Sequence, residues 1–303
     1  MTASQSLRAA LTANAAFSFC SALVLIVAPE LVSQTTGLGP AVLLRVVGVG
    51  LALFAADLIH QATRKRLITW RALYASLADF SWVVGSIALA VFFPEPLTPI
   101  GVAVVLGIAT VVLAFGVWQM RAIDRTHRAS QPDAYRHCVM IDTDAPAERL
   151  WPLIANFGDI QRYAGNLRSS RILGGIAPAV GTVRSCEDRA GRRWSEECVV
   201  FEQNRIELRF LCDAPDFPFP VARMQGGWQV TPTTSGSRIM IWWELKPKNR
   251  ILAPLLLSIF GCQADRDFPR IVQRMAAHAR GEPQSAPGAG AAPALGRLVA
   301  IPC

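Results

Sequence analysis

The sequence predicts two regions of different fold class: an N-terminal all-α four-helix transmembrane bundle, and a C-terminal α+β domain in which a curved antiparallel sheet surrounds a long helix. The chain of 303 residues is 52% hydrophobic and only 17% charged, with a mean hydropathy of +0.32, whereas an ordinary soluble domain has about 25% charged residues. The apolar excess lies in the first 120 residues, and short runs of alternating polarity follow. We expect a four-span region at 1–120, a linker at 121–135, a domain at 136–280 and a disordered Ala/Pro/Gly-rich tail at 281–303.

Four apolar stretches before residue 121 are each long enough to cross a bilayer, which takes about 20 residues of helix. They cover residues 10–28, 41–60, 68–93 and 100–120. Helix-breaking residues occupy the first and third connections, among them Pro29, Pro94 and Pro96. The sequence therefore predicts an integral membrane protein whose first partner is the lipid bilayer.

Basic residues in the short connections predict the orientation of these spans. Two connections carry them, at Arg64, Lys65 and Arg66 and at Arg121, Arg125 and Arg128, while the other two connections contain no Lys or Arg. The positive-inside rule then places both termini and the C-terminal domain in the cytoplasm, with the spans in the inner membrane. Much of the net charge of +8 is explained in this way, so no nucleic-acid partner is expected.

Three charged residues fall within the predicted spans: Arg45, Asp57 and Asp79. Each costs a few kcal/mol unless it is paired, so such residues suggest function or a structural pair. Asp79 is the most central, and Arg45 lies about two helical turns away along the bundle. We expect an Arg45–Asp79 pair that fixes the register of the helices, with a proton or substrate path as the alternative. Lys65 or Arg71 could neutralise Asp57.

The segment after residue 136 reads as one strand, two short helices, a six-stranded meander and a final helix. The strands are expected at 139–143, 170–173, 182–186, 193–201, 205–212, 224–232 and 237–246, with hairpin turns at 188–192, 202–204 and 233–237. Alternation is clearest in the last strand, where Ile239, Ile241 and Trp243 share one face. An amphipathic helix over about 250–280 would cover the apolar face of the sheet.

The opening of this domain resembles a known family. Four features are similar to the START-like SRPBCC superfamily, in particular its polyketide cyclase/dehydrase and lipid-transport branch. They are the run from Ile141 to Trp151 followed by residues 153–157, the segment 175–184, Glu196 with Glu202, and Trp243-Glu244-Leu245-Lys246-Pro247. The resemblance covers about residues 136–280 and implies a helix-grip fold. It departs from the branch at Arg162-Tyr163, where a Trp followed by Pro is common.

The resemblance implies a pocket between the sheet and the last helix that takes a hydrophobic small molecule, such as a lipid, a polyketide or another aromatic. It does not imply catalysis, because many members only bind and carry. The large aromatics of the domain are candidate pocket walls, with ordinary core packing as the alternative for each. They are Trp151, Tyr163, Phe210, Trp228 and Trp243.

Glu196 is the one weak candidate for a catalytic residue. Its strand phase matches Trp194 and Cys198, and a carboxylate that faces an apolar pocket is suited to proton transfer. Two alternatives stay open, because Glu197 could face inward instead, or Glu196 could simply pair with Arg184 on a neighbouring strand.

Other chemistry finds little support in the sequence. The four His and seven Cys show no metal-ligand spacing, and no nucleophile elbow, P-loop or dinucleotide motif is present. We therefore expect no metal and no cofactor, and the cysteines read as reduced, mostly structural thiols.

Three functions follow from these observations. The first is membrane-tethered binding or transfer of a hydrophobic small molecule. The second is a cyclase/dehydratase-like enzyme that uses Glu196 as acid/base. The third is a ligand-sensing or assembly protein read out through the bundle, whose protein partners the sequence does not indicate.

Overall fold

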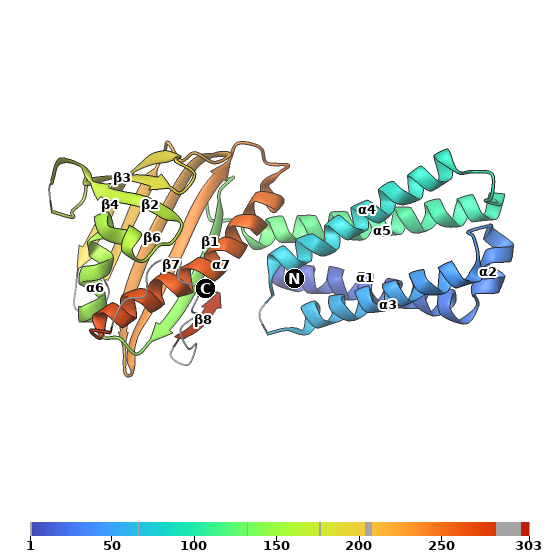
Figure 1. Ribbon diagram of the computed structural model, residues 1–303, viewed down its shortest axis with the longest axis horizontal. Coiled ribbons are helices and arrows are strands. Elements are labelled where there is room, and N and C mark those ends of the chain that lie inside the picture. Colours follow the sequence, from blue (N-terminus) through green and yellow to red (C-terminus); the bar gives the residue numbers. More distant parts are fainter. Residues whose placement is uncertain are drawn as a thin grey trace. The chain divides into compact units, whose positions relative to one another are not determined.

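The computed structural model describes residues 2–65, 67–131, 133–175, 177–203, 208–282 and 298–302, with side chains for all of these except 208–212 and 298–302. Arg66, one of the basic residues used above, lies outside the described residues. The chain divides into two compact units, Met1–Thr126 and His127–Cys303 (Figure 1). Each is described by itself below.

The first unit consists of helices. They are α1 (Ala3–Val27), α2 (Pro29–Thr36), α3 (Ala41–Thr63), α4 (Thr69–Phe92) and α5 (Pro99–Thr126). The four long ones are long and apolar enough to cross a membrane, as the sequence predicts. The short helix α2 was not expected. It begins with Pro29, whose missing N–H costs nothing at a helix start, and ends at Gly37 in a left-handed conformation (φ 74°).

Within the first unit, α1 runs along α3 and α4 along α5 (Figure 1). Apolar side chains such as Phe19, Val84 and Phe92 point outward, as expected for surfaces in contact with lipid. An apolar cluster that includes Leu7, Leu58 and Ile123 packs inside. Polar side chains also lie inside the bundle, among them Asn14, Asp79 and Gln119.

The second unit is a curled antiparallel half-barrel of seven strands packed against one long helix, α7 (Ala253–Ala279) (Figure 1). The strands are β1 (Tyr135–Thr143), β2 (Leu167–Ile172), β3 (Val183–Asp188), β4 (Arg193–Gln203), β5 (Leu208–Ala214), β6 (Val221–Thr233) and β7 (Gly236–Pro247). Their order in the sheet is β2-β3-β4-β5-β6-β7-β1. Between β1 and β2 lie α6 (Ala147–Ala155) and the 3-10 helix η1 (Phe157–Arg162), and η2 (Leu173–Gly175) follows β2.

The strands and the final helix agree with those predicted from alternation and turn residues. Two turns depend on glycine: Gly191 between β3 and β4 has φ 81°, and Gly236 between β6 and β7 has φ 147°, a region that other residues rarely adopt. At Gly236 a Cβ would also meet the backbone oxygen of Thr143 at 2.1 Å. The β6–β7 turn therefore packs directly on the end of β1.

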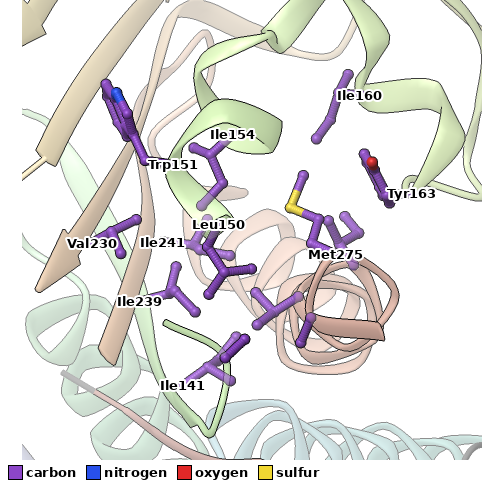
Figure 2. Close-up of a cluster of buried hydrophobic side chains, with 14 of the residues drawn as sticks. Ile141, Leu150, Trp151, Ile154, Ile160, Tyr163, Val230, Ile239, Ile241 and Met275 are labelled. Atoms are coloured by element: carbon purple, nitrogen blue, oxygen red, sulfur yellow. The ribbon is translucent and has the colours of Figure 1, made fainter. Parts of the chain in front are cut away.

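The core of the domain lies between the sheet, α6 and α7. Figure 2 shows Ile141, Ile239 and Ile241 of the sheet facing Leu150 of α6 and Met275 of α7. All five are almost completely buried. This cluster fills the half of the domain near α6 with the chain's own side chains.

The C-terminal tail differs from the expected disorder over 281–303. Residues Leu298–Pro302 form strand β8, antiparallel to β1, with Ile141 opposite Ala300. The reason is that β1 offers a free edge and the run Leu298-Val299-Ala300-Ile301 has high strand propensity. Residues 283–297 and 303 lie outside the described residues.

The cysteines require a second correction. Cys20, Cys186, Cys198 and Cys262 are free thiols, but Cys138 on β1 is disulfide-bonded. The expectation of reduced thiols came from the absence of motif spacing, which is no test of whether a cysteine forms a disulfide. Disulfides persist mainly in oxidising compartments, so this bond bears on the orientation discussed below.

Candidate functional sites

A cavity of about 140 Å³ lies on the inner side of the half-barrel. Its lining comes from β3 to β7, from the β5–β6 connection and from α7. The lining residues are Arg184, Glu196, Ala214, Phe217, Met224, Gln225, Gly226, Gly227, Trp228, Ile241, Trp242, Trp243 and Phe268. The cavity is therefore mainly aromatic and aliphatic, with one pair of opposite charges.

Gly226 explains why space is left at this point of the sheet. It lies opposite Trp243 of β7 and Cys212 of β5, so a side chain at position 226 would project on the same face as the inward Trp243. A Cβ there would meet only the Trp242 carbonyl oxygen, at 3.7 Å. The missing side chain in the middle of β6 thus leaves open the space that the lining residues surround.

Glu196 points into this cavity and is held by several donors. Arg184 Nε donates to Glu196 Oε2 over 3.0 Å, and Trp194 Nε1 donates to Glu196 Oε1 over 2.7 Å. The Arg184 and Glu196 side chains are only 10% and 15% exposed. Arg184 also donates to the carbonyl oxygen of Phe157. Of the alternatives left open above, the structure shows the pair with Arg184, whereas Glu197 is exposed.

The thiol of Cys186 lies beside this pair. Its Sγ is 3.9 Å from Glu196 Oε1 and 3.8 Å from Ser170 Oγ. Burial, followed by the nearby negative charge of Glu196, raises the pKa of Cys186 to about 11. The thiol is therefore protonated at neutral pH and is a poor nucleophile.

The predicted aromatic walls divide into two groups. Trp228 and Trp243 line the cavity. Trp151 and Tyr163 lie instead in the buried cluster of Figure 2, where Trp151 packs on Phe201 and the Tyr163 hydroxyl is 2.5 Å from His278 Nδ1. The side chain of Phe210 lies outside the described residues, although its backbone pairs with Trp228.

Sequence reasoning missed several lining residues: Phe217, Met224, Gly226 and Phe268. Phe217 comes from a connection between strands, where alternation gives no orientation. A usable signal was present in Gly226-Gly227, because paired glycines in the middle of a strand often mark a close approach or an open space.

Of the charged residues in the predicted spans, Arg45 is paired differently from the prediction. Arg45 pairs with Glu30 at the start of α2 (2.8 Å), and both side chains are exposed. The expected Arg45–Asp79 pair is therefore wrong, because a nearer carboxylate takes the guanidinium. Asp57 accepts a hydrogen bond from Arg71 over 2.9 Å. Arg71 is one of the two partners expected for Asp57.

Asp79 is 97% buried and is held by neutral amides. Asn14 Nδ2 of α1 lies 3.1 Å and 2.9 Å from its two carboxylate oxygens, and Gln119 Nε2 of α5 donates over 3.1 Å. Ser18 and Ser76 extend this network by donating to Asn14 Oδ1 and Gln119 Oε1. Sequence reasoning considered only charges in the spans and missed both amides.

Within the described part of the chain, no three His, Cys, Asp or Glu residues are grouped so that they could hold a metal ion. His137 Nε2 lies 3.0 Å from Asp265 Oδ1, and its ring stacks on Trp243 with centroids 5.4 Å apart. His137 therefore links β1 to α7 and supports Trp243, which lines the cavity.

The fold and this cavity define the class of the second unit: a helix-grip domain whose sheet and last helix enclose a small, mainly apolar space. Residues 138–280 match the model of the family "Polyketide cyclase / dehydrase and lipid transport". This part of the chain is a domain of that SRPBCC family, preceded by four long apolar helices.

Comparison with solved structures finds similar chains at low identity. The protein XoxI from Bacillus cereus is 19% identical, with 46% of this chain and 93% of that chain covered and a TM-score of 0.37. A point mutant of norcoclaurine synthase from Thalictrum flavum, in complex with a transition-state analogue, is 14% identical, with 49% and 94% covered and a TM-score of 0.37. A hypothetical protein from Helicobacter pylori is 12% identical, with 51% and 93% covered and a TM-score of 0.40. A search of curated proteins finds no match.

Proposed function

We propose that the protein binds a small hydrophobic molecule in the cavity of its helix-grip domain while the four long helices hold it in the membrane. The observation that carries the proposal is the lining of the cavity, in which aromatic and aliphatic walls surround a single, internally satisfied ion pair. Such a site favours an apolar or aromatic molecule with few polar atoms. Tethering shortens the path through water for a molecule that dissolves in the bilayer.

The size of the cavity limits the ligand. A volume of about 140 Å³ is below the roughly 300 Å³ of common ligand pockets. A compact molecule such as a bicyclic aromatic fits this proposal better than a whole phospholipid. Larger ligands require Phe217, Phe219 and Phe260 to move, because these three rings pack together beside the cavity.

The enzymatic alternative is less well supported. A general base must have an oxygen free to take a proton from the substrate. Two nitrogens of Arg184 donate to Glu196 Oε2, and Trp194 Nε1 and the Cys186 thiol donate to Oε1. These four contacts fill the roughly four acceptor sites of a carboxylate, which favours a role in fixing the wall of the cavity. We therefore propose binding or transfer rather than a cyclase reaction.

Ligand binding can be tested with the full chain in lipid nanodiscs and 1-naphthol as the probe. Trp228, Trp242 and Trp243 line the cavity, so binding should quench tryptophan fluorescence in a saturable way. Gly226→Val should weaken binding about tenfold because its side chain occupies the cavity. Ala222→Val, at an exposed position of the same strand, is the matched control and should bind normally. Equal affinity in both variants, or no saturable quenching, would reject this site.

We also propose that the C-terminal domain lies in the cytoplasm. The basic residues after α3 and α5 support this orientation, whereas the disulfide of Cys138 would favour an oxidising compartment. In a bacterial expression host, trypsin should digest the domain in inverted membrane vesicles and leave it intact in spheroplasts. The opposite pattern would overturn the proposed orientation.

A further inference from the structure

A second and larger cavity lies inside the helical unit. Its volume is about 570 Å³, and all five helices contribute to its lining. Most of the lining is apolar, with Leu51 of α3, Trp82 of α4 and Val104 of α5 as examples. This space is large enough for a small-molecule ligand.

The cavity is elongated. One face of α1 lines it from Asn14 to Leu25, a distance of about 16 Å at 1.5 Å per residue. Helix α2 closes one end, because Thr35 and Thr36 of α2 line the cavity and their carbonyl oxygens accept from Thr98 beside the start of α5. The contact between α2 and α5 is so close that a Cβ on Gly101 would lie 1.9 Å from the oxygen of Thr36.

The polar part of the lining is concentrated around Asp79. This residue lines the cavity together with Asn14 and Ser18, near the middle of α4 and α1. An ionised carboxylate offers about four acceptor sites, and Asn14 and Gln119 make three hydrogen-bond contacts to it. The amides therefore fix the orientation of the carboxylate and leave acceptor capacity for a group that enters the cavity.

We propose that this cavity is a binding site for an elongated apolar molecule that ends in a hydrogen-bond donor, a hydroxyl or an ammonium group. The apolar body lies along α1 toward α2, and the donor reaches Asp79. A buried charge in a membrane span is expensive and is commonly found where a protein binds or moves something. This site lies within the helical unit, so it does not depend on the cavity of the helix-grip domain.

The test uses the full chain in nanodiscs and two photoactivatable probes, a diazirine-bearing hexadecanol and the hexadecane with the diazirine at the same carbon. Peptide mapping identifies the labelled residues. The alcohol should label cavity-lining residues in a saturable way, about tenfold more strongly than the alkane. Asp79→Asn should reduce this preference several-fold because it removes the negative charge. Equal labelling by both probes would show that lipid chains merely fill the space, and would overturn the proposal.

Two valines of α5 provide matched variants. Val104 lines the cavity and Val111 does not, although their side chains are similarly exposed at 38% and 39%. Val104→Trp should lower saturable labelling by the alcohol at least fivefold, whereas Val111→Trp should leave it unchanged. Loss of labelling in both variants, or in neither, would contradict a site in this cavity. Gly226→Val, which affects the other cavity, should not change the labelling and thus separates the two proposals.

Discussion

Each unit holds a carboxylate at the lining of its cavity, and the two are held in different ways. In the helix-grip domain, Glu196 is neutralised by the guanidinium of Arg184 on the neighbouring strand. In the helical unit, Asp79 accepts from the neutral amides of Asn14 and Gln119 on two other helices. The first arrangement pairs a carboxylate with a cation, whereas the second gives a carboxylate only neutral hydrogen-bond donors.

The difference has a consequence for function. Because Arg184 and Glu196 neutralise each other, the wall of the cavity attracts ions only weakly, which suits an apolar ligand. Asp79 is held by neutral amides and not by a cation, so in its ionised form it attracts a donor or a cation inside a low-dielectric environment. The two cavities are therefore expected to prefer different ends of an amphipathic molecule.

The largest expected effect concerns the pair in the helix-grip domain. Arg184→Met should lower the free energy of unfolding by about 3 kcal/mol, because it leaves Glu196 buried beside Cys186 without its cation. Thermal unfolding of the domain in the full chain, followed by tryptophan fluorescence, measures the change. The double variant Arg184→Met/Glu196→Met should recover a large part of the loss, since it removes the orphaned charge as well.

If the double variant lost as much unfolding free energy as the two single variants together, packing and not ion pairing would keep these residues in place. Glu196→Gln offers an intermediate case. It keeps an acceptor for Arg184 and Trp194 but removes the charge, so its loss should be smaller than that of Arg184→Met.

Much of the fold follows from local patterns in the sequence. Long apolar runs predicted the four long apolar helices, and the alternation of Ile239, Ile241 and Trp243 predicted the inner face of β7. Strand phase suggested Glu196 as an inward residue but left Glu197 and a pair with Arg184 as alternatives, and the structure shows the pair. These features depend on periodicity, which a single sequence contains.

Other features depend on packing between distant segments, and the sequence did not predict them. Axial spacing suggested Asp79 as the partner of Arg45, and only the position of α2 shows that Glu30 pairs with it. Trp151 and Trp243 are equally large and buried, but one fills the core and the other lines the cavity. The pairing of β8 with β1 likewise depends on a free sheet edge.

The second prediction tests the amides around Asp79. Asn14→Leu keeps the size of the side chain but removes its hydrogen bonds to both carboxylate oxygens, so the helical unit should lose about 2 kcal/mol of stability. Ser18→Ala removes only an outer hydrogen bond and should cost less than about 1 kcal/mol. Thermal unfolding in one detergent compares them. Equal losses in the two variants would show that Asp79 does not rely on Asn14.

The third prediction is a pH dependence that originates at Cys186 and is confined to alkaline solution. Burial raises the pKa of this thiol to about 11, from an ordinary value of 9.0, so only the unfolded state ionises between these values. The contribution to stability is complete below about pH 9 and is lost as the pH rises toward about 11.

Unfolding of the wild type and of Cys186→Ala between pH 8 and 11 measures this contribution, because the variant lacks the thiol. The variant should lose less stability over this range. Glu196→Gln connects the effect to the ion pair: without that negative charge the pKa of Cys186 should fall, and iodoacetamide should modify Cys186 of the folded protein faster at pH 9, as measured by peptide mapping. Identical alkaline slopes in the wild type and Cys186→Ala would mean that the buried thiol does not govern stability there. Rapid alkylation of Cys186 in the wild type at pH 8 would mean that the cavity wall is open to water.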